Sequence, residues 1–303
     1  MIQQSNITIF GGDGFIGRNL IKTLAKLNIK INVVHNNSRH NDCSSLFGFP
    51  GQISYLKFED SQRFFEYVFR HSDCIINLIG ILRETQNKKF YSTHVKIAKQ
   101  IALCASKFSV KRLIHISALG INKTHTISNY SKTKLQGEIE ILKHFPNATI
   151  LRPSLVFGAN DQFINILVRL AKILPVFPLI NKGYIFFQPI FVEDLTSIIT
   201  KVIFANNSWF NSKIFEIGGP DKIMLLTIVS NILKRVNKKQ RYFYLNYKIL
   251  KLVSYLSKLI NNFPITLEEV NLLLMHNIVE KSNLADVLDI KLTPIVFYIN
   301  KVY

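Results

Sequence analysis

The sequence predicts an α/β fold, in which a doubly wound parallel sheet is followed by a smaller, mostly helical C-terminal lobe. Six short runs rich in β-branched residues recur in the first half of the chain. Segments with helical periodicity separate most of these runs, and a glycine-rich turn follows the first one. Strands that alternate with helices form a parallel sheet with helices on both faces, joined by right-handed crossovers.

The elements can be assigned in order along the chain. The runs at 7–10, 31–35, 53–58, 74–79, 112–117 and 148–151 predict strands. The segments 15–27, 90–108 and 130–144 predict helices. The alternation weakens after about residue 155, where the chain becomes loop-rich and then more helical. We therefore expect a first domain over 1–154 and a C-terminal lobe over 155–303, with elements at about 185–205 returning to the first domain.

Composition narrows the classes of function. The formal charge is +19, but lysine supplies most of it and is scattered along the chain, so we expect no nucleic acid. An anionic cofactor, an anionic membrane surface and an acidic partner all stay open. The three cysteines lie far apart and predict reduced thiols. The eight histidines form no ligand set, so no metal is expected.

The sequence also predicts a location. No run reaches the roughly 18 to 20 uncharged apolar residues that a membrane-spanning helix needs. The first ten residues already enter a predicted strand, which leaves no room for a signal or transit peptide. We therefore expect a cytoplasmic protein.

The strongest motif is the glycine-rich turn FGGDGFIG between the first strand and the first helix. It contains Gly11, Gly12, Gly14, Phe15, Ile16 and Gly17. Glycine is needed where a chain turns sharply, where its backbone approaches a pyrophosphate, and where the helix packs on the strand. The start of the helix then offers free N–H groups to a phosphate. In this context the turn predicts a dinucleotide-binding Rossmann domain.

A second motif is the stretch SNYSKTKLQGE, in which Tyr130 and Lys134 share one face of a predicted helix. A phenol with a pKa near 10 must lose about three units to act as an acid–base near pH 7, roughly 4 kcal/mol. An ammonium about 4 Å away contributes on the order of 4 kcal/mol at an intermediate dielectric constant. The lysine is therefore sufficient to activate the tyrosine, and it could also hold a ribose. An exposed helix with incidental Tyr and Lys residues is the structural alternative.

Further motifs continue to the end of the chain. They are NLIG at 77–80, KRLIHISALG at 111–120, LRPSLVFG at 151–158, QPIFVEDL at 188–195 and FEIGGP at 215–220. Together with the glycine turn and YSKTK, they resemble an atypical extended short-chain dehydrogenase/reductase of the NAD-dependent epimerase/dehydratase type. HISALG, ILRPSLVFG, FQPIFVEDL and FPITLEEVNLL resemble more specifically the nucleotide-binding accessory subunit of respiratory complex I and its bacterial relatives. Those relatives include an accessory protein of ubiquinone biosynthesis.

The resemblance implies further cofactor contacts. Asn77, Leu78 and Gly80 would flank the ribose and pyrophosphate, Glu59 or Asp60 would meet the adenine, and Pro153 and Ser154 would lie beside the nicotinamide. Each position is also compatible with a structural role, as a polar residue at a strand end or a proline in a turn.

The resemblance also bears on catalysis. Active relatives place a Ser or Thr near the end of the fifth strand, and Ser117 occupies that position. Ala118 and Leu119 follow where active members usually have further hydroxyl groups. His94 stands where extended members often place an asparagine that supports a catalytic water. We therefore expect the tyrosine–lysine pair to anchor a cofactor first and to catalyse second.

The end of the second predicted strand bears on cofactor choice. Proteins of this fold that bind NAD place Asp or Glu about 20 residues beyond the glycine turn. This chain has no acid from Ile31 to His40, whereas Arg39 and His35 lie there. A guanidinium can bind a 2′-phosphate in bidentate fashion. The sequence thus favours NADP(H), with NAD(H) as the alternative.

Three functions follow from these expectations. The main hypothesis is an NAD(P)(H)-binding protein that holds its dinucleotide for structural or regulatory purposes in a respiratory or quinone-related assembly, with complex I or ubiquinone-biosynthesis proteins as partners. The alternative is an active NADP-dependent reductase, dehydrogenase or epimerase that acts on a small carbonyl or hydroxyl substrate through Tyr130 and Lys134. A nucleotide-free scaffold is the third.

The stretch 246–263 is amphipathic at helical spacing, with apolar residues on one face and lysines on another. Such a helix is compatible with peripheral contact on the cytoplasmic face of the inner membrane. Packing of its apolar face on the C-terminal lobe is the other interpretation.

Overall fold

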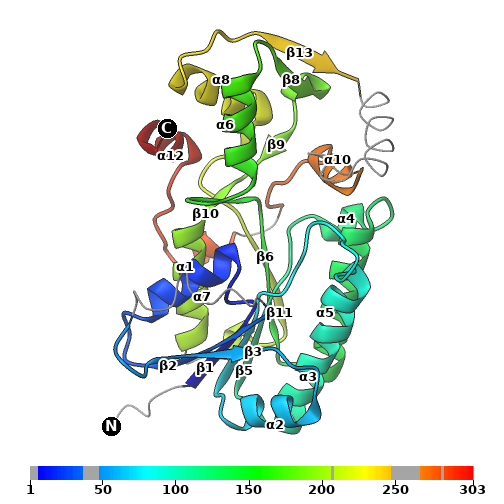
Figure 1. Ribbon diagram of the computed structural model, residues 1–303, viewed down its shortest axis with the longest axis vertical. Helices are drawn as coiled ribbons and strands as arrows, with labels where there is room; N and C mark the ends of the chain where they lie inside the picture. Colours follow the sequence, from blue (N-terminus) through cyan, green and yellow to red (C-terminus); the bar gives the residue numbers. More distant parts are fainter. Residues whose placement is uncertain (1–5, 37–47, 206–207, 247–266, 281–282, 303) are drawn as a thin grey trace. The chain divides into compact units, whose positions relative to one another are not determined.

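The computed structural model describes residues 6–36, 48–205, 208–246, 267–280 and 283–302, and it confirms the predicted α/β fold (Figure 1). The chain forms two compact units. Unit 1 comprises residues up to 118 together with 133–152 and 192–215. Unit 2 comprises 119–132, 153–191 and the residues from 216 onward. The units interleave along the sequence, and the proposed division at residue 154 stays a prediction.

A seven-stranded sheet forms the centre of unit 1. The last residues of two of its strands, Pro153 and 216–217, belong to unit 2. The strands predicted from the sequence are β1 (Asn6–Phe10), β2 (Lys30–His35), β3 (Ile53–Lys57), β4 (Cys74–Asn77), β5 (Arg112–Ile116) and β6 (Thr149–Pro153). The order is β11-β6-β5-β4-β1-β2-β3, and the six predicted strands pair in parallel. The edge strand β11 (Lys213–Ile217) was not predicted. Because the strand order reverses beside β1, the carboxyl ends of β1 and β4 form the crevice where such sheets bind ligands.

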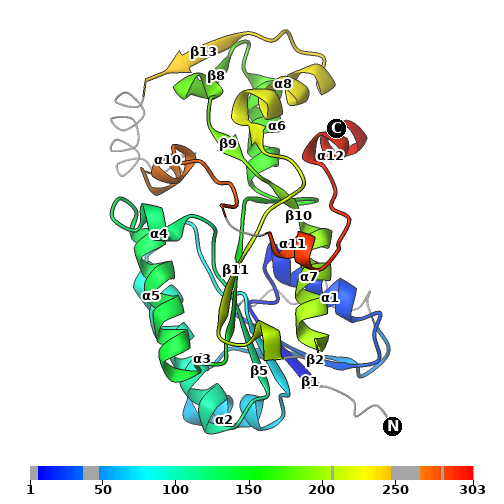
Figure 2. The same ribbon diagram turned by 180° about the vertical axis from the view of Figure 1, so that it is seen from behind.

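Helices cover both faces of this sheet, as Figures 1 and 2 show. One face carries α1 (Phe15–Leu24) and α7 (Val192–Phe204), which contact each other. The other carries α2 (Gln62–Arg70), α3 (Ile97–Lys107) and α5 (Asn129–His144). Buried side chains from both the strands and these helices, including Phe10, Phe69, Ile75, Ile101 and Ile141, form the core of the second face. Because these strands are buried on both faces, their sequences are continuous apolar runs and do not alternate between apolar and polar residues.

The predicted helix over 90–108 begins with a π-helix, η2 (Tyr91–Lys96). α5 crosses this segment closely at Gly137, where an added Cβ would collide with the backbone oxygen of His94. A π-helical turn inside a helix often marks a functional position. Here it carries His94, which is buried.

The opposite end of the sheet is tied to α7 by Arg112. Its guanidinium donates to the carbonyl oxygens of Ile203 and Ala205, both at 2.7 Å, and to that of Val202. These carbonyls belong to the end of α7, where backbone oxygens have no partner within the helix. Arg112 therefore serves as a side-chain cap for α7. The short helix η4 (Ser208–Phe210) follows.

Unit 2 is built from short helices and two-stranded sheets. Its elements are α4 (Ile121–Thr124), β7 (Val156–Phe157), α6 (Phe163–Ile173), β8 (Phe177–Ile180), η3 (Asn181–Gly183), β9 (Phe186–Phe187), β10 (Ile190–Phe191), β12 (Ile223–Met224), α8 (Leu225–Arg235), β13 (Tyr242–Leu245), α10 (Leu267–Leu273), α11 (Leu284–Val287) and α12 (Ile295–Val302). Apolar faces of α6, α8 and α12 meet in one core with Phe157 and Phe187.

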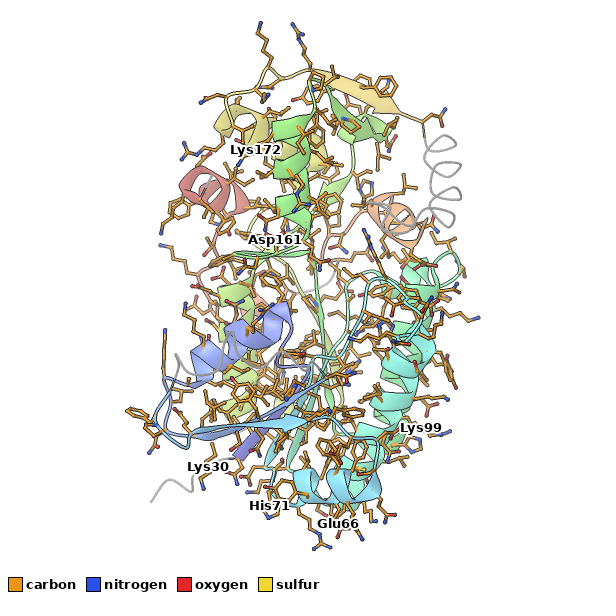
Figure 3. The ribbon with its side chains drawn as sticks, viewed as in Figure 1. Lys30, Glu66, His71, Lys99, Asp161 and Lys172 are labelled. Carbon is orange, nitrogen blue, oxygen red and sulfur yellow. The ribbon has the colours of Figure 1, made fainter. Side chains whose placement is uncertain are left out.

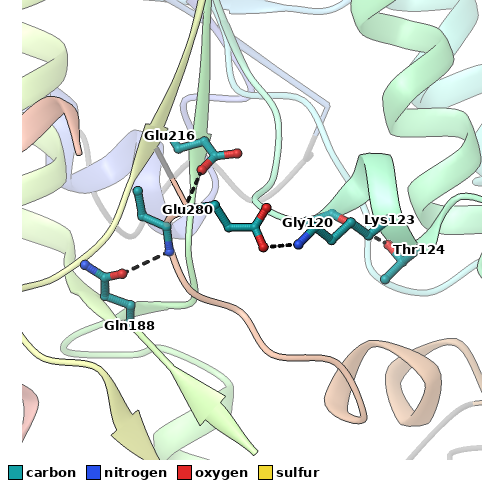
Figure 4. A network of polar contacts seen from close by, with 7 residues as sticks. Gly120, Lys123, Thr124, Gln188, Glu216 and Glu280 are labelled. Carbon is teal, nitrogen blue, oxygen red and sulfur yellow. Dashed lines mark hydrogen bonds and ion pairs between the residues drawn. The ribbon is translucent and has the colours of Figure 1, made fainter. Parts of the chain in front are cut away.

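Gln188 joins three distant segments of unit 2. Its Nε2 donates to Gly219 O at 2.9 Å. Its Oε1 accepts from Val279 N at 2.9 Å, which is the contact that Figure 4 draws from Gln188. A Cβ on Gly219 would collide with Pro189 O, so this approach requires glycine. Next to it, Glu280 N donates to Glu216 Oε2 at 3.1 Å, and the Glu280 side chain pairs with Lys123. The motifs QPIFVEDL and FEIGGP are thus neighbours in the fold.

Within the described ranges, no helix combines the length and apolarity needed to cross a bilayer. The amphipathic stretch predicted at 246–263 lies outside the described residues, except for Asn246. Cys74 and Cys104 are buried free thiols, and Cys43 also lies outside the described residues.

Candidate functional site

The glycine turn forms an open cradle between β1 and α1. α1 starts after Gly14 with no side-chain cap and no acidic residue in its first turn. An added Cβ on Gly17 would lie 2.6 Å from Gly12 O, and one on Gly12 would lie 2.6 Å from the Val33 side chain. On Gly14 an added Cβ would meet only Gly11 O, at 3.3 Å. Packing therefore requires Gly12 and Gly17, while the space at Gly14 leaves the N–H groups of Phe15 and Ile16 accessible to an anion. These features fit the pyrophosphate of a dinucleotide.

The NLIG segment lies beside this cradle. Leu78 N donates to Phe10 O at 2.9 Å, and an added Cβ on Gly11 would lie 3.2 Å from Ile79 N. Asn77 is buried, and its Oδ1 accepts from Ile79 N at 3.0 Å. Its Nδ2 lies 3.0 Å from His115 Nδ1. The side chain of Asn77 thus shapes the loop from within, which leaves the backbone of 78–80 next to the glycine turn.

Lys134 reaches the same place from α5. Its buried Nζ donates to Ile116 O at 2.8 Å, and an added Cβ on Gly80 would lie 3.9 Å from this nitrogen. Burial lowers the pKa of Lys134 to about 8, and the charge of Glu138 opposes this shift. Lys134 thus stands beside Gly80, where a ribose hydroxyl could accept a hydrogen bond from it.

Glu138 is itself held by a buried ion pair. Arg152 Nε donates to Glu138 Oε1 at 2.9 Å, and its second nitrogen donates to Oε2 at 2.6 Å. The pair connects β6 to the helix that carries Lys134. Neither residue was predicted as part of the site, although Glu138 lies in SNYSKTKLQGE and Arg152 in LRPSLVFG.

His94 occupies the place beside Lys134 and is fully engaged. Its Nε2 accepts from Ile81 N at 3.1 Å, and its Nδ1 lies 2.9 Å from Thr133 Oγ1. Burial, together with the nearby charge of Lys134, lowers the pKa of His94 to about 3. The imidazole is therefore neutral, and the proton on its Nδ1 is directed to the threonine. Because both ring nitrogens are bonded within the protein, neither can bind a water molecule that would pass on a proton.

Tyr130 lies half-buried in the first turn of α5 and belongs to unit 2. Burial raises its pKa to about 12, a shift opposite to the lowering that we expected from Lys134. The reason is physical, since removal of water penalises the charged phenolate. The helix start at Tyr130 is capped by Glu268, which accepts from Ser128 Oγ at 2.7 Å and from Asn129 N at 3.2 Å. Sequence reasoning missed Glu268, although it lies in the motif FPITLEEVNLL.

Two buried serines lie at strand ends. Ser117 N donates to Leu151 O at 2.8 Å, directly after β5, and Ser154 N donates to Ile217 O at 2.8 Å, directly after Pro153. The Oγ atoms of both serines are buried and have no hydrogen-bond partner among the described residues. Such hydroxyl groups are expected to meet a ligand or water. Ser117 belongs to unit 1, whereas Pro153 and Ser154 belong to unit 2.

The remaining candidates lie at the ends of β2 and β3. His35 is buried at the end of β2, with its ring 6.4 Å from that of Tyr55. Glu59 and Asp60 are exposed just after β3. Arg39 lies outside the described residues. In the part of the chain that the structure describes, no group of three or more His, Cys, Asp or Glu side chains could hold a metal ion.

The glycine cradle, the adjacent loop and the helix with Tyr130 and Lys134 all fall within one family match. Residues 7–218 match the NAD dependent epimerase/dehydratase family. The chain belongs to this family. The membership confirms the resemblance, and the family takes a nicotinamide dinucleotide, which the cradle fits.

Several relatives of this chain are respiratory subunits by name. The mitochondrial NADH dehydrogenase (ubiquinone) 1 alpha subcomplex subunit 9 of Arabidopsis thaliana is 31% identical over 80% of this chain and 61% of its own length. The mitochondrial NADH-ubiquinone oxidoreductase 40 kDa subunit of Neurospora crassa is 28% identical over 80% of this chain and 64% of its own length. The chain thus spans less than two thirds of each of these relatives.

Solved structures of epimerase/dehydratase members share the fold. The dTDP-glucose 4,6-dehydratase of Bacillus anthracis in complex with NAD superposes with a TM-score of 0.67 at 19% identity, covering 88% of this chain and 94% of that chain. At this identity the likeness concerns the fold alone.

Proposed function

We propose that the protein binds a nicotinamide dinucleotide, NADP(H) in preference to NAD(H), and holds it mainly for structural or regulatory purposes in a respiratory or quinone-related assembly. One observation carries the proposal: the glycine cradle at the start of α1 is open to an anion, whereas the proton relay beside it is closed. His94 engages both ring nitrogens within the protein and is neutral. Tyr130, with a pKa of about 12, would be a weak acid–base near neutral pH.

We propose a role for each of the binding residues. The N–H groups after Gly14 would hold the pyrophosphate, and the backbone of 78–80 with Lys134 would hold the nicotinamide ribose. Glu59 or Asp60 would meet the adenine amino group, and Ser117, Pro153 and Ser154 would serve the nicotinamide end. When bound, the dinucleotide supplies a hydride acceptor or donor, and the chain's own residues position it and exclude water.

The assembly is proposed from the relatives. The Arabidopsis and Neurospora proteins are subunits of an NADH–ubiquinone oxidoreductase. We propose the same kind of partner for this chain, with a peripheral place on the cytoplasmic face of the membrane through 246–263.

The decisive experiment identifies the nucleotide in freshly purified protein by mass spectrometry and then offers the loaded protein a broad panel of carbonyl and hydroxyl substrates. We expect stoichiometric nucleotide whose redox state does not change. Tyr130→Phe should then weaken retention modestly, and Lys134→Ala should weaken it more because it removes a charge near the ribose. Protein that is purified without nucleotide and binds none when it is added would refute the proposal.

Cofactor choice has its own test. Arg39→Ala should weaken NADP(H) binding and leave NAD(H) binding unchanged, because only NADP(H) carries the 2′-phosphate. Equal or tighter binding of NAD(H), unaffected by this substitution, would reverse the assignment.

One observation favours the alternative of an active reductase. The buried hydroxyl group of Ser117 has no hydrogen-bond partner among the described residues and is a donor that a substrate carbonyl could engage. A dehydrogenase activity that disappears in both Tyr130→Phe and Ser117→Ala would establish that function instead.

A further inference from the structure

Two segments of unit 2 that share one apolar core contain no acidic residue. They are 162–191 with α6 and 222–246 with α8, and we call them the basic lobe; Asp161 and Asp221 lie directly before them. Neither segment contains an Asp or Glu, and the nine basic side chains are all exposed: Arg169, Lys172, Lys182, Lys222, Lys234, Arg235, Lys238, Lys239 and Arg241. Elsewhere acids are interspersed with the lysines, as in α5 and α7. The lobe therefore departs from the general basic composition of the chain.

Six of these cations gather at one end of the lobe. α6 begins just after Asp161 and ends just after Lys172. Figure 3 labels both residues, one at each end of the helix. α8 ends at Arg235, and the turn that follows is fixed by Lys238 N donating to Leu233 O at 2.9 Å. The chain then enters β13, where Arg241 O accepts from Phe177 N at 2.8 Å. We call this end, with Lys172, Lys234, Arg235, Lys238, Lys239 and Arg241, the tip.

Helix dipoles explain only half of this charge. Lys172, Lys234 and Arg235 lie in the last turns of α6 and α8, where cations are favourable. Lys238, Lys239 and Arg241 lie beyond the helices, and no ion pair to a carboxylate is recorded for them in the described part of the chain. Like charges so close together repel one another, and an anionic partner would relieve this repulsion.

The tip also exposes large apolar side chains. Ile173 is 69% exposed, Val176 39% and Phe243 58%. Val176 directly precedes β8, and Phe243 pairs in register with Pro178 of the same strand, so these side chains belong to one end of the lobe. Figures 1 and 2 show the ends of α6 and α8 near β13 in both views. The tip thus combines aliphatic and aromatic groups with a rim of long basic side chains.

We propose that the tip binds an anionic lipid surface. Lysine and arginine stems can lie along apolar groups while their charges stay at the headgroups, and the side chains of Ile173, Val176 and Phe243 enter the boundary of the acyl chains. Two of the three exposed apolar side chains, Ile173 and Val176, are aliphatic, which favours a lipid over a nucleic acid, whose bases stack on aromatic rings. This inference goes beyond dinucleotide binding and uses residues other than 246–263.

The test is flotation of the full-length protein with vesicles of phosphatidylcholine alone or of phosphatidylcholine mixed with phosphatidylglycerol. Binding is expected only to the mixed vesicles and should weaken as salt is raised. The variant with Lys238→Glu, Lys239→Glu and Arg241→Glu should bind at least a hundredfold more weakly, since each cation near an anionic surface is worth about fivefold. Phe243→Ser keeps every charge and removes only an apolar contact. It should therefore weaken binding more at high salt, where the electrostatic attraction is screened, than at low salt.

The matched control changes Lys26, Lys30 and Lys88 of unit 1 to glutamate, which alters the net charge equally at exposed positions. This control should keep most of the binding, and thermal melts should show that both variants are folded. Equal losses in the two triple variants, binding to phosphatidylcholine alone, or tighter binding to an RNA oligonucleotide or to polyglutamate would overturn the proposal. Dinucleotide binding is measured in parallel, so a failure of the proposed function leaves a separate signature.

Discussion

At the scale of single residues, Lys134 sets the pH dependence of the cradle. Its pKa of about 8 means that the free protein loses this charge as the pH rises through about 8. We expect dinucleotide affinity to be flat near neutral pH and to fall above about 8, since the neutral amine attracts phosphate and ribose less. His94, with a pKa of about 3, and Tyr130, with one of about 12, keep their protonation throughout this window. Titrations of NADP(H) binding against pH in the native protein and in Lys134→Met check this, and an equal fall in both would contradict it.

Lys134 should affect stability in the opposite direction: as the pH rises, dinucleotide affinity falls but the free energy of unfolding increases. The pKa of Lys134 is lower in the folded chain than the ordinary value of 10.5. Between about 8 and 10.5 the unfolded chain therefore binds more protons, and this group's contribution to stability rises with pH. Below about pH 8 its full unfavourable contribution is present. Relative to Lys134→Met, the native protein should gain free energy of unfolding across that window, as urea titrations at several pH values can measure.

The ion pair behind Lys134 makes a second residue-scale prediction. Glu138 raises the pKa of the lysine, so Glu138→Gln should move the fall in dinucleotide affinity to lower pH. The same change removes the carboxylate from a buried ion pair, which typically costs about 3 to 5 kcal/mol. Binding titrations and urea unfolding test the two effects separately. Lys143→Ala, at an exposed position of the same helix, serves as control, and an unmoved pH profile in Glu138→Gln would show that the carboxylate is only structural.

At the scale of elements, the close crossing of α5 and η2 depends on one missing side chain. Gly137→Ala adds a Cβ that collides with His94 O, so either α5 must shift or the π-helix must rearrange. Alanine is a better helix former than glycine by about 1 kcal/mol. Overpacking costs of about 1 to 3 kcal/mol should outweigh this gain. Urea unfolding should thus show a net loss, whereas a more stable Gly137→Ala protein would mean that the contact yields.

The elements also show what the sequence could predict. The six strands were predicted because β-branched runs buried on both faces are continuous, and the glycine turn because its glycines have separate steric causes. The strand β11 was missed because KIFEI is short and its first two residues are exposed, as is typical at a sheet edge. The π-helix could not be predicted, since periodicity near 3.6 also describes the segment around it. His94 and Thr133, or Asn77 and His115, lie 39 and 38 residues apart, so only the fold reveals their contacts.

At the scale of the whole molecule, the interleaving of the two units matters for folding. Unit 1 takes its last elements from 192–215, far along the chain from its first strand. α7 contacts α1, and its final carbonyls are the ones that Arg112 caps. β11 occupies the edge of the sheet beside β6. The first 154 residues therefore hold the glycine cradle, the adjacent loop and Lys134, but not all of the structure that supports them.

This arrangement predicts that a fragment of residues 1–154 does not fold cooperatively. Without α7, the apolar face of α1 is exposed, and without β11 the edge of β6 presents unpaired backbone groups that favour aggregation. Arg112 also loses the carbonyls of Ile203 and Ala205 and leaves a charged group without partners at the sheet end. We expect the fragment to show no sharp thermal transition by circular dichroism and to bind no NADP(H), whereas the full chain does both. Adding residues 192–215 in trans as a peptide should restore part of the binding. A fragment that melts cooperatively and binds nucleotide alone would mean that the continuous segment before residue 155 is an autonomous domain after all.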